Sequence, residues 1–494
     1  MTQVRFALFA GLLGLALAGS SRAENQKPLN VLFIAVDDLR PELGCYGHPV
    51  VKTPNIDRLA SQGTLFTRAY CQQAVCNPSR ASLMTALRPE STGVMDLPTY
   101  FRDKRPNAVT VAQHFKENGY HSQGIGKIYH TGHGNKDDAL SWSVREKFKR
   151  ASRFGPEGRK LLARLRREAK AKGIDLKDPR INPRGLPWEA PDVADELLTD
   201  GDFCERAIKI LREHKDEPFF LAVGFLNPHL PFVAPKKYWD LYDPEKIELA
   251  DNPHPPKGSP KVAHTSWGEL RKYYGMPKKG PLSEEQARTA IHGYWAATSY
   301  VDALVGRLLN ELDRLGLRDD TVVILWGDHG WQLGEHGFWC KHTNYEVAAR
   351  VPLIISVPGQ KNAGAKSDAL VEFVDVFPTL SDVCGLSTPE GLEGVSFRPL
   401  LDDPNRSWKK AAFHLYPRNI KGKGRCLGRA IRTDRYRLVE WRMLKDRKLV
   451  GRELYDLEND PDENTNLAKR PELAPVVAQL SGELKAGWRD ALPE

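Results

Sequence analysis

Apolar runs of strand length alternate along this chain with segments whose apolar residues recur at helical spacing. The runs that suit buried strands occupy residues 29–36, 120–125, 218–224, 321–326 and 351–357. Helical spacing is found over residues 53–60, 81–86, 109–118, 193–213 and 283–315. Repeated units of strand and helix are typical of a parallel sheet with helices on both faces. The pattern therefore predicts an α/β fold built on a large, mostly parallel sheet flanked by helices.

Two segments depart from this alternation. Residues 145–184 carry fifteen Lys and Arg against five Asp and Glu, a net charge of +10, and include an amphipathic stretch at 159–172. This composition favours a solvated insertion helix, and a contact surface for an anionic polymer is the alternative. From about Trp408 onward the apolar runs become shorter and strand-like, as at 436–441, and a last helix is expected near 475–488. These features predict a small C-terminal α+β subdomain.

The N-terminus has the pattern of an export signal. Residues 1–5 are short and basic, residues 6–19 are apolar, and Ser21 and Ala23 are small residues at the −3 and −1 positions of a cleavage site. We expect a cleaved signal peptide over 1–23, with an uncleaved anchor as the alternative. The apolar run is shorter than the roughly 20 residues that a membrane-spanning helix needs.

The predicted mature chain is therefore secreted or periplasmic and has no membrane span. It comprises a catalytic α/β domain over 24–404, including the basic insertion at about 145–184, and a C-terminal subdomain over 405–494.

Composition limits the class of protein. The 494 residues are 41% apolar and include 11 Trp, which excludes a disordered chain. The formal net charge of +9 admits anionic partners, and we expect no nucleic-acid partner. Seven cysteines without a Cys-x-x-Cys pair exclude a disulfide-dense scaffold and a zinc knuckle, and their odd number leaves at least one unpaired.

Acidic residues follow two of the predicted strands at the point where each strand ends. The first run leads into Asp37 and Asp38, and the run at 321–326 leads into Asp328 and His329. Ligands of open α/β sheets bind outside the carboxyl ends of the strands. Three carboxylates and an imidazole gathered there favour a divalent cation, and the oxygen-rich set favours Ca²⁺ or Mg²⁺. The alternative is that Asp37 and Asp38 only cap the next helix.

A third element concerns one cysteine. Cys76 opens the run Cys76-Asn77-Pro78-Ser79-Arg80, directly before the predicted helix at 81–86. At a helix N-terminus the amide donors and the dipole favour negative charge, so an anion could be held there. With this composition a Cys-x-Pro-x-Arg run is expected by chance fewer than about 0.07 times. The run therefore weakens the alternative of an inert buried cysteine.

These motifs resemble those of the formylglycine-dependent sulfatases of the alkaline phosphatase superfamily. The resemblance rests on residues 76–80 and 83–89, and it extends from residue 30 to about residue 462. Residues 38–47, 72–76 and 328–337 are most similar to the iduronate-2-sulfatase branch. The resemblance implies an alkaline phosphatase-like fold and a hydrolase that acts on sulfate esters of carbohydrates.

The resemblance also implies a cofactor and a modified residue. A formylglycine-generating maturation enzyme would convert Cys76 to formylglycine, whose aldehyde hydrate is the nucleophile. The implied ligands of one divalent ion, Ca²⁺ with Mg²⁺ as the alternative, are Asp37, Asp38, the modified Cys76, Asp328 and His329. Many sulfatases have Asn where His329 stands, so this residue departs from the broad family pattern but matches the iduronate-2-sulfatase branch.

The remaining site residues come from the same resemblance. Arg80 would steady the hydrate, while Lys127, His130, His229 and Lys341 would surround the sulfate of a sulfated carbohydrate. We expect His229 rather than Lys341 to act as the general acid. Two alternatives are a phosphonate or phosphodiester hydrolase of the same superfamily and an inactive carbohydrate-binding homologue.

Overall fold

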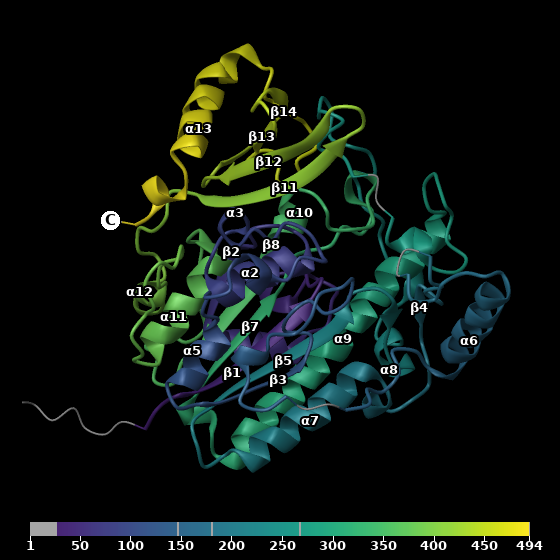
Figure 1. The fold of residues 1–494 in the computed structure, drawn as a ribbon, viewed down its shortest axis with the longest axis vertical. Coiled ribbons are helices and arrows are strands. Elements are labelled where there is room, and N and C mark those ends of the chain that lie inside the picture. Colours follow the sequence, from purple (N-terminus) through teal and green to yellow (C-terminus); the bar gives the residue numbers. More distant parts are fainter. Residues whose placement is uncertain (1–26, 146–147, 179–180, 266–267, 494) are drawn as a thin grey trace, which may run out of the picture.

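The structure is a computed structural model that describes residues 27–145, 148–178, 181–265 and 268–493. The signal peptide predicted over 1–23 lies outside the described residues. Figure 1 shows a large α/β body and, above it, a smaller C-terminal layer of antiparallel strands with one long helix. Among the described residues, no helix is long and apolar enough to cross a membrane. All seven cysteines carry free thiols.

An eight-stranded sheet forms the centre of the body. Its strands are β1 (Asn30–Asp37), β2 (Thr64–Tyr70), β3 (His121–Gly126), β5 (Phe219–Pro228), β7 (Thr321–Gly327), β8 (Arg350–Ser356), β9 (Ala365–Ser367) and β10 (Val371–Glu372). The order is β10-β2-β8-β7-β1-β5-β3, with β9 paired to β2. Only β8 runs antiparallel to its neighbours β2 and β7 among these pairs. The predicted α/β class and mostly parallel sheet are confirmed.

Helices cover both faces of this sheet. Successive side chains of β1 point to opposite faces and so pack against both layers of helices. Leu32, Ile34 and Val36 pack in one cluster with residues of α9 (Glu284–Leu315), α7 (Thr199–Glu213) and α1 (Pro54–Ser61). Val31, Phe33 and Ala35 pack in the other cluster with residues of α2 (Cys76–Thr85), α5 (Val111–Glu117) and α11 (Val376–Val383). Every residue of β1 is buried, which explains its continuous apolar run.

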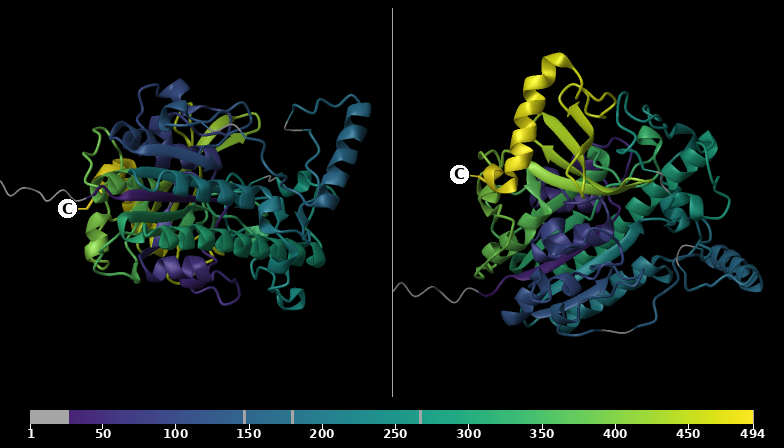
Figure 2. Two further views of the ribbon diagram at one scale, coloured as in Figure 1. Left: turned by 90° about the horizontal axis from the view of Figure 1, so that it is seen from below. Right: turned by 45° about the horizontal axis from the view of Figure 1, so that its top comes forward.

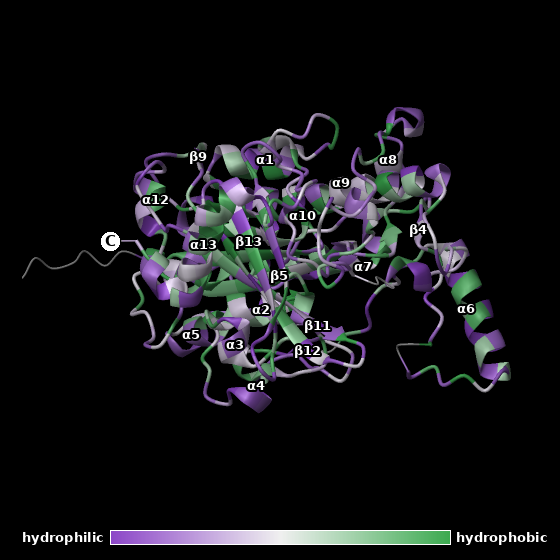
Figure 3. Ribbon diagram, turned by 90° about the horizontal axis from the view of Figure 1, so that it is seen from above, coloured by the Kyte–Doolittle hydropathy of each residue, from purple (hydrophilic) through white to green (hydrophobic). Residues whose placement is uncertain are grey.

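Shorter elements connect these layers. They are α3 (Pro89–Thr92), α4 (Phe101–Lys104), α8 (Lys236–Trp239), α10 (Glu346–Ala349), α12 (Arg398–Asp402), β4 (Trp188–Glu189) and β6 (Phe232–Val233). The basic insertion forms α6 (Pro156–Ala171), of which only Gly158 and Ala169 are buried. Figure 2 shows α6 projecting from the body, and Figure 3 shows hydrophilic and hydrophobic residues alternating along it. The helix therefore has the solvated character that its composition favoured.

The C-terminal layer is an antiparallel sheet with a helix on one face. The sheet has the order β11-β12-β13-β14 and consists of β11 (Ala412–Ile420), β12 (Gly424–Arg432), β13 (Tyr436–Met443) and β14 (Leu449–Asp456). On one face Leu438 packs with Val477 and Leu480 of α13 (Ala474–Ala486). On the other face Trp441 packs with Val75, next to Cys76. This architecture agrees with the α+β subdomain expected there, while its boundary at 404/405 stays a prediction.

Candidate active site

The carboxyl ends of β1 and β7 bring the two acidic pairs together. The strands are adjacent and parallel, with Val36 opposite Gly327, so Asp37 and Asp38 lie beside Asp328 and His329. Asp38 adopts a left-handed backbone conformation with φ of 61°, and its amide donates to Asp328 Oδ1 at 2.9 Å. The structure therefore brings all four of these predicted residues to one edge of the sheet.

Cys76 joins this group from the first turn of α2. Its Sγ lies 3.3 Å from Nε2 of His329, and one ligand atom from each of Asp37, Asp38, Cys76 and His329 lies within 4.8 Å of the others. The thiol sulfur stands in for the hydroxyl oxygens that a formylglycine hydrate would offer. Two buried carboxylates, an imidazole and that oxygen form a donor set that fits a hard divalent cation.

Asp328 differs from the other predicted ligands in its surroundings. Its carboxylate accepts from Arg80 Nε at 2.8 Å and from the Asp38 amide, and it lies outside the 4.8 Å group. His329 Nε2 is 3.5 Å from Asp328 Oδ1. In this structure Asp328 therefore orients Arg80 and Asp38 at the edge of the site.

Three cations surround the acidic residues. Arg80 is fully buried, lies over the Trp326 ring at 5.4 Å and is 3.4 Å from Asp37 Oδ1. Lys127 forms an ion pair with Asp37, and its Nζ lies 3.4 Å from Cys76 Sγ. Lys341 lies 3.0 Å from Asp38 Oδ1. Positive charge thus lies directly beside Cys76.

The charges around Cys76 determine which of the neighbouring groups are ionised. Burial opposes ionisation of Asp37, but the charges of Lys127, His229 and Arg80 outweigh it and hold the pKa of Asp37 well below its usual range. Burial and the nearby Asp37 charge raise the pKa of the Cys76 thiol well above its ordinary value. Burial of Lys341 is outweighed by Asp38 and Glu269, which raise its pKa. An unmodified Cys76 is therefore a neutral thiol here, whereas Lys341 keeps its charge.

A cavity of about 600 Å³ opens above Cys76. Among the residues that line it are the predicted Lys127, His130, His229 and Lys341. His130 Nε2 lies 3.2 Å from Nδ1 of His133, and burial, with the nearby Lys127 charge, lowers the pKa of His130 to about 2. His130 is therefore a neutral imidazole that can donate or accept one hydrogen bond in the cavity.

Glu269 is a site residue that the sequence did not indicate. One of its oxygens lies 3.2 Å from His229 Nε2 and the other lies 3.1 Å from Lys341 Nζ. Burial opposes ionisation, but Lys341 and His229 hold the pKa of Glu269 well below its usual range. Glu269 lies in a segment without apolar periodicity, so no pattern in the sequence marked it.

The basic insertion also contributes to the cavity. Arg150, Arg153 and Arg184, which flank α6, line the cavity together with Lys272. Arg153 donates to the carbonyls of His229 and Leu230 at 3.2 and 3.0 Å. The net charge of +10 over 145–184 indicated that this segment could contact an anion. It did not show that residues flanking α6, and not α6 itself, line the cavity.

Comparisons with known proteins agree with this geometry. The family model described as Sulfatase matches residues 29–386, and the model described as N-sulphoglucosamine sulphohydrolase, C-terminal, matches residues 334–489. Iduronate 2-sulfatase of Homo sapiens is 35% identical over 89% of this chain and 91% of its own length. The Mus musculus protein of the same name is 37% identical over 78% of this chain and 74% of its own.

A solved structure extends the likeness to the fold. The phosphonate monoester hydrolase of Agrobacterium radiobacter superposes with a TM-score of 0.72 at 26% identity, over 94% of this chain and 96% of its own. The chain therefore belongs to the sulfatase family and is a sulfuric ester hydrolase.

Proposed function

We propose that this sulfatase removes sulfate from a carbohydrate that carries further anionic groups, such as a sulfated, uronic-acid-containing saccharide. The observation that carries the proposal is the charge of the cavity above Cys76. Six Lys and Arg side chains line it against the two carboxylates of Asp37 and Glu269. A cavity with this surplus favours a substrate with more than one negative group. The iduronate 2-sulfatases to which the chain is similar support the same substrate class.

In this proposal the chain matures at Cys76. A formylglycine-generating enzyme oxidises the Cys76 side chain to an aldehyde with loss of its sulfur, and water adds to the aldehyde to form the hydrate. One hydroxyl of the hydrate attacks the sulfur atom of the ester and expels the alcohol, and the other hydroxyl then loses its proton, expels sulfate and restores the aldehyde. The neutral, buried thiol described above would be a poor nucleophile without this conversion. We further propose the cleaved signal peptide over 1–23, with a secreted or periplasmic location.

Asp37, Asp38, His329 and the modified Cys76 would hold one divalent ion, Ca²⁺ in this proposal, together with Asp328. When bound, the ion would neutralise the carboxylates and stabilise negative charge at the reacting oxygens. Asp328 keeps a second role through its bond to Arg80 Nε.

The cations next to the nucleophile act on the sulfate. Lys127 and Lys341 lie fixed beside Cys76 and Asp38, so they would bind the sulfate oxygens without reorganising during the reaction. Charge moves onto the leaving oxygen as the sulfur–oxygen bond breaks. Arg80, buried between Asp37 and Asp328, would hold the nucleophile in place.

His229 would protonate the leaving oxygen. Its Nδ1 lies 2.7 Å from the carbonyl oxygen of Leu230, and its Nε2 lies 3.2 Å from Glu269. Burial and Lys341 lower the pKa of His229, and Glu269 opposes them, so Glu269 orients the ring and favours its protonated form. The proton would come from Nε2, which turns from Glu269 to the leaving oxygen when the ester binds. His130 would donate a hydrogen bond to the bound sulfate from the same cavity.

The test is a panel of defined sulfated saccharides, an aryl sulfate and a matched phosphodiester, with released sulfate or phosphate as the readout. The proposal predicts sulfate release from saccharides that carry a uronate or a second sulfate, faster than from a singly charged aryl sulfate. A preference for the phosphodiester, or saccharide binding without sulfate release, would contradict it and support the two alternatives.

A further inference from the structure

A second cavity, of about 780 Å³, lies between the C-terminal sheet, the end of α13 and the segment that follows α2. It shares no lining residue with the cavity above Cys76. Glu440 and Arg442 of β13 line it, whereas their neighbours Val439 and Trp441 pack against Val75 on the other face of the sheet. The sheet therefore separates this cavity from the catalytic one.

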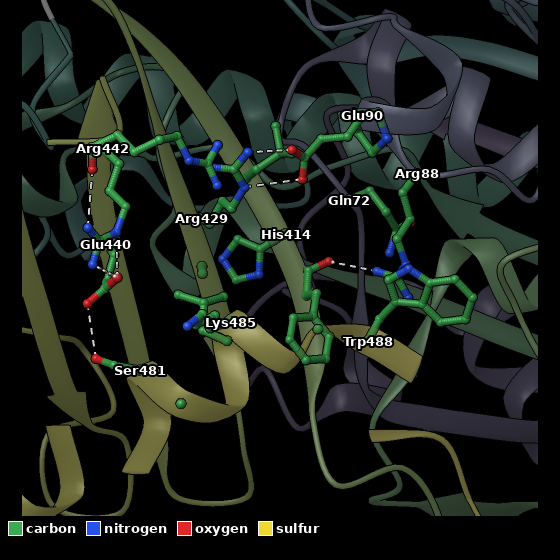
Figure 4. A pocket seen from close by; sticks show the side chains of 18 of the residues that line it. Gln72, Arg88, Glu90, His414, Arg429, Glu440, Arg442, Ser481, Lys485 and Trp488 are labelled. Atoms are coloured by element: carbon green, nitrogen blue, oxygen red, sulfur yellow. Dashed lines mark hydrogen bonds and ion pairs between the residues drawn. The ribbon is translucent and has the colours of Figure 1, made fainter. Parts of the chain in front are cut away.

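The cavity carries a positive surplus. Six Lys and Arg side chains line it, of which Arg88 pairs with the buried Glu372, Arg429 with Glu90, and Arg442 and Arg452 with Glu440. Figure 4 shows Arg88 and Trp488 at one side, Glu440 and Arg442 at the other, and Lys485 between them. Arg447 and Lys485 are exposed, and neither side chain has an ion pair or hydrogen bond among the described residues. These two charges are available to an anion.

Three buried side chains of the cavity carry polar atoms without a partner in the described chain. They are Gln72 Oε1, Arg88 Nε and His414 Nδ1, on residues that are 1%, 7% and 4% exposed. His414 Nε2 faces the Asn344 carbonyl at 3.1 Å and must donate to it, which leaves Nδ1 as an acceptor. Each of these atoms exposes less than 1 Å², so a ligand reaches them only when neighbouring side chains move, and it then makes hydrogen bonds that the described chain leaves unmade.

The needs of these atoms define the chemistry of that ligand. Two acceptors and one donor require hydroxyl groups, which can both donate and accept, and a simple inorganic anion does not supply donors. Trp488 is half-buried and lines the cavity with an aromatic ring, on which the guanidiniums of Arg88 and Arg489 stack at 5.1 and 4.3 Å from the ring centre. Hydroxyl groups, a ring of C–H groups and negative charges occur together in an anionic saccharide.

We propose that this cavity is a non-catalytic binding site for a sulfated saccharide. The ring lies against Trp488, and its sulfate or carboxylate groups reach Arg447 and Lys485. Its hydroxyls reach Gln72 and His414 after neighbouring side chains move. The site would hold a glycan chain on the enzyme independently of sulfate hydrolysis, so it does not depend on the reaction proposed for Cys76.

The experiment uses the full chain with Cys76→Ala, to prevent turnover, and a heparin tetrasaccharide as the probe. Hydrogen exchange followed by mass spectrometry reports protection of residues 481–488 separately from the catalytic loops. The pocket variant is Arg447→Gln with Lys485→Gln, which removes two exposed, unpaired charges. The matched control is Lys445→Gln with Lys448→Gln, two exposed cations nearby that do not line the cavity.

The proposal predicts that the tetrasaccharide protects residues 481–488 in the Cys76→Ala chain, which is the reference chain, and in the control variant. In the pocket variant the concentration for half-maximal protection rises about tenfold, as expected for two lost charge contacts. When the pocket substitutions are made in the chain that keeps Cys76, the rate of aryl sulfate hydrolysis is unchanged. Absence of protection in the reference chain, equal loss in the control, or equal protection by inorganic sulfate would overturn the proposal.

Discussion

Replacing Glu269 by Gln tests whether this carboxylate acts through His229. The substitution keeps the size of the side chain and removes the charge that lies 3.2 Å from His229 Nε2 and 3.1 Å from Lys341 Nζ. Burial and Lys341 lower the pKa of His229, whereas Glu269 raises it. Without Glu269 the pKa of His229 therefore falls further below 6.5, and less of the imidazole is protonated at a given pH.

The size of the effect follows from the bond that is lost. A hydrogen bond to a charged group contributes about 1.5–3 kcal/mol, and losing that amount from the transition state corresponds to about a ten- to hundredfold loss of rate. Rates fall as pH rises through the pKa of a general acid, so that limb of the profile moves to lower pH. The hydrolysis of a sugar sulfate, whose alcohol oxygen is a poor leaving group, slows by this factor. The hydrolysis of an activated aryl sulfate changes little.

The assay is kcat as a function of pH for a saccharide sulfate and for an aryl sulfate. Glu248→Gln, which removes an exposed carboxylate, is the matched control, and Glu269→Asp should restore part of the rate. The reasoning is refuted if both substrates lose the same factor or if the profile of Glu269→Gln does not move along the pH axis. Equal losses would mean that Glu269 acts on Lys341 and substrate binding instead.

Three further predictions follow from the same site. Arg80→Met leaves Asp37 and Asp328 buried without their guanidinium, so urea unfolding should show a loss of about 3–5 kcal/mol, against no loss for the exposed Arg167→Met. Chelation of divalent ions should abolish sulfate release and lower the melting temperature by calorimetry, because Asp37 and Asp38 lose their counterion, and added Ca²⁺ should restore both. Lys341→Met should lower kcat by about a hundred- to a thousandfold in a saccharide assay, and an effect on KM alone would contradict its role beside the nucleophile.

The arrangement of Cys76 and its acidic neighbours was largely predictable from the sequence. Parallel strands end at one edge of a sheet, so the residues after β1 and β7 were expected at that edge, and the motif at Cys76 placed that residue at the start of α2. That β1 and β7 are direct neighbours is a finding of the structure. The buried strands were visible as apolar runs because both of their faces are covered by helices. The antiparallel direction of β8 was not, because an apolar run has no direction of its own.

Other features depend on tertiary contacts that no local pattern encodes. Glu269 reaches His229 and Lys341 from an irregular segment, and its neighbours in the sequence carry no periodic signal. The second cavity joins side chains from Arg88, His414 and Lys485, which lie far apart along the chain. They come together because α13 packs on the C-terminal sheet, and because the segment after α2 contacts that layer through Arg88 and Trp488 and through Glu90 and Arg429.

The central claim is that Cys76, converted to an aldehyde among Asp37, Asp38 and His329, is the nucleophile. Mass spectrometry of the peptide that spans Cys76, taken from sulfate-releasing protein purified from its own host, tests this most directly. The account predicts a formylglycine at position 76 in the active material. An intact thiol there, in protein that still releases sulfate at its full rate, would contradict it.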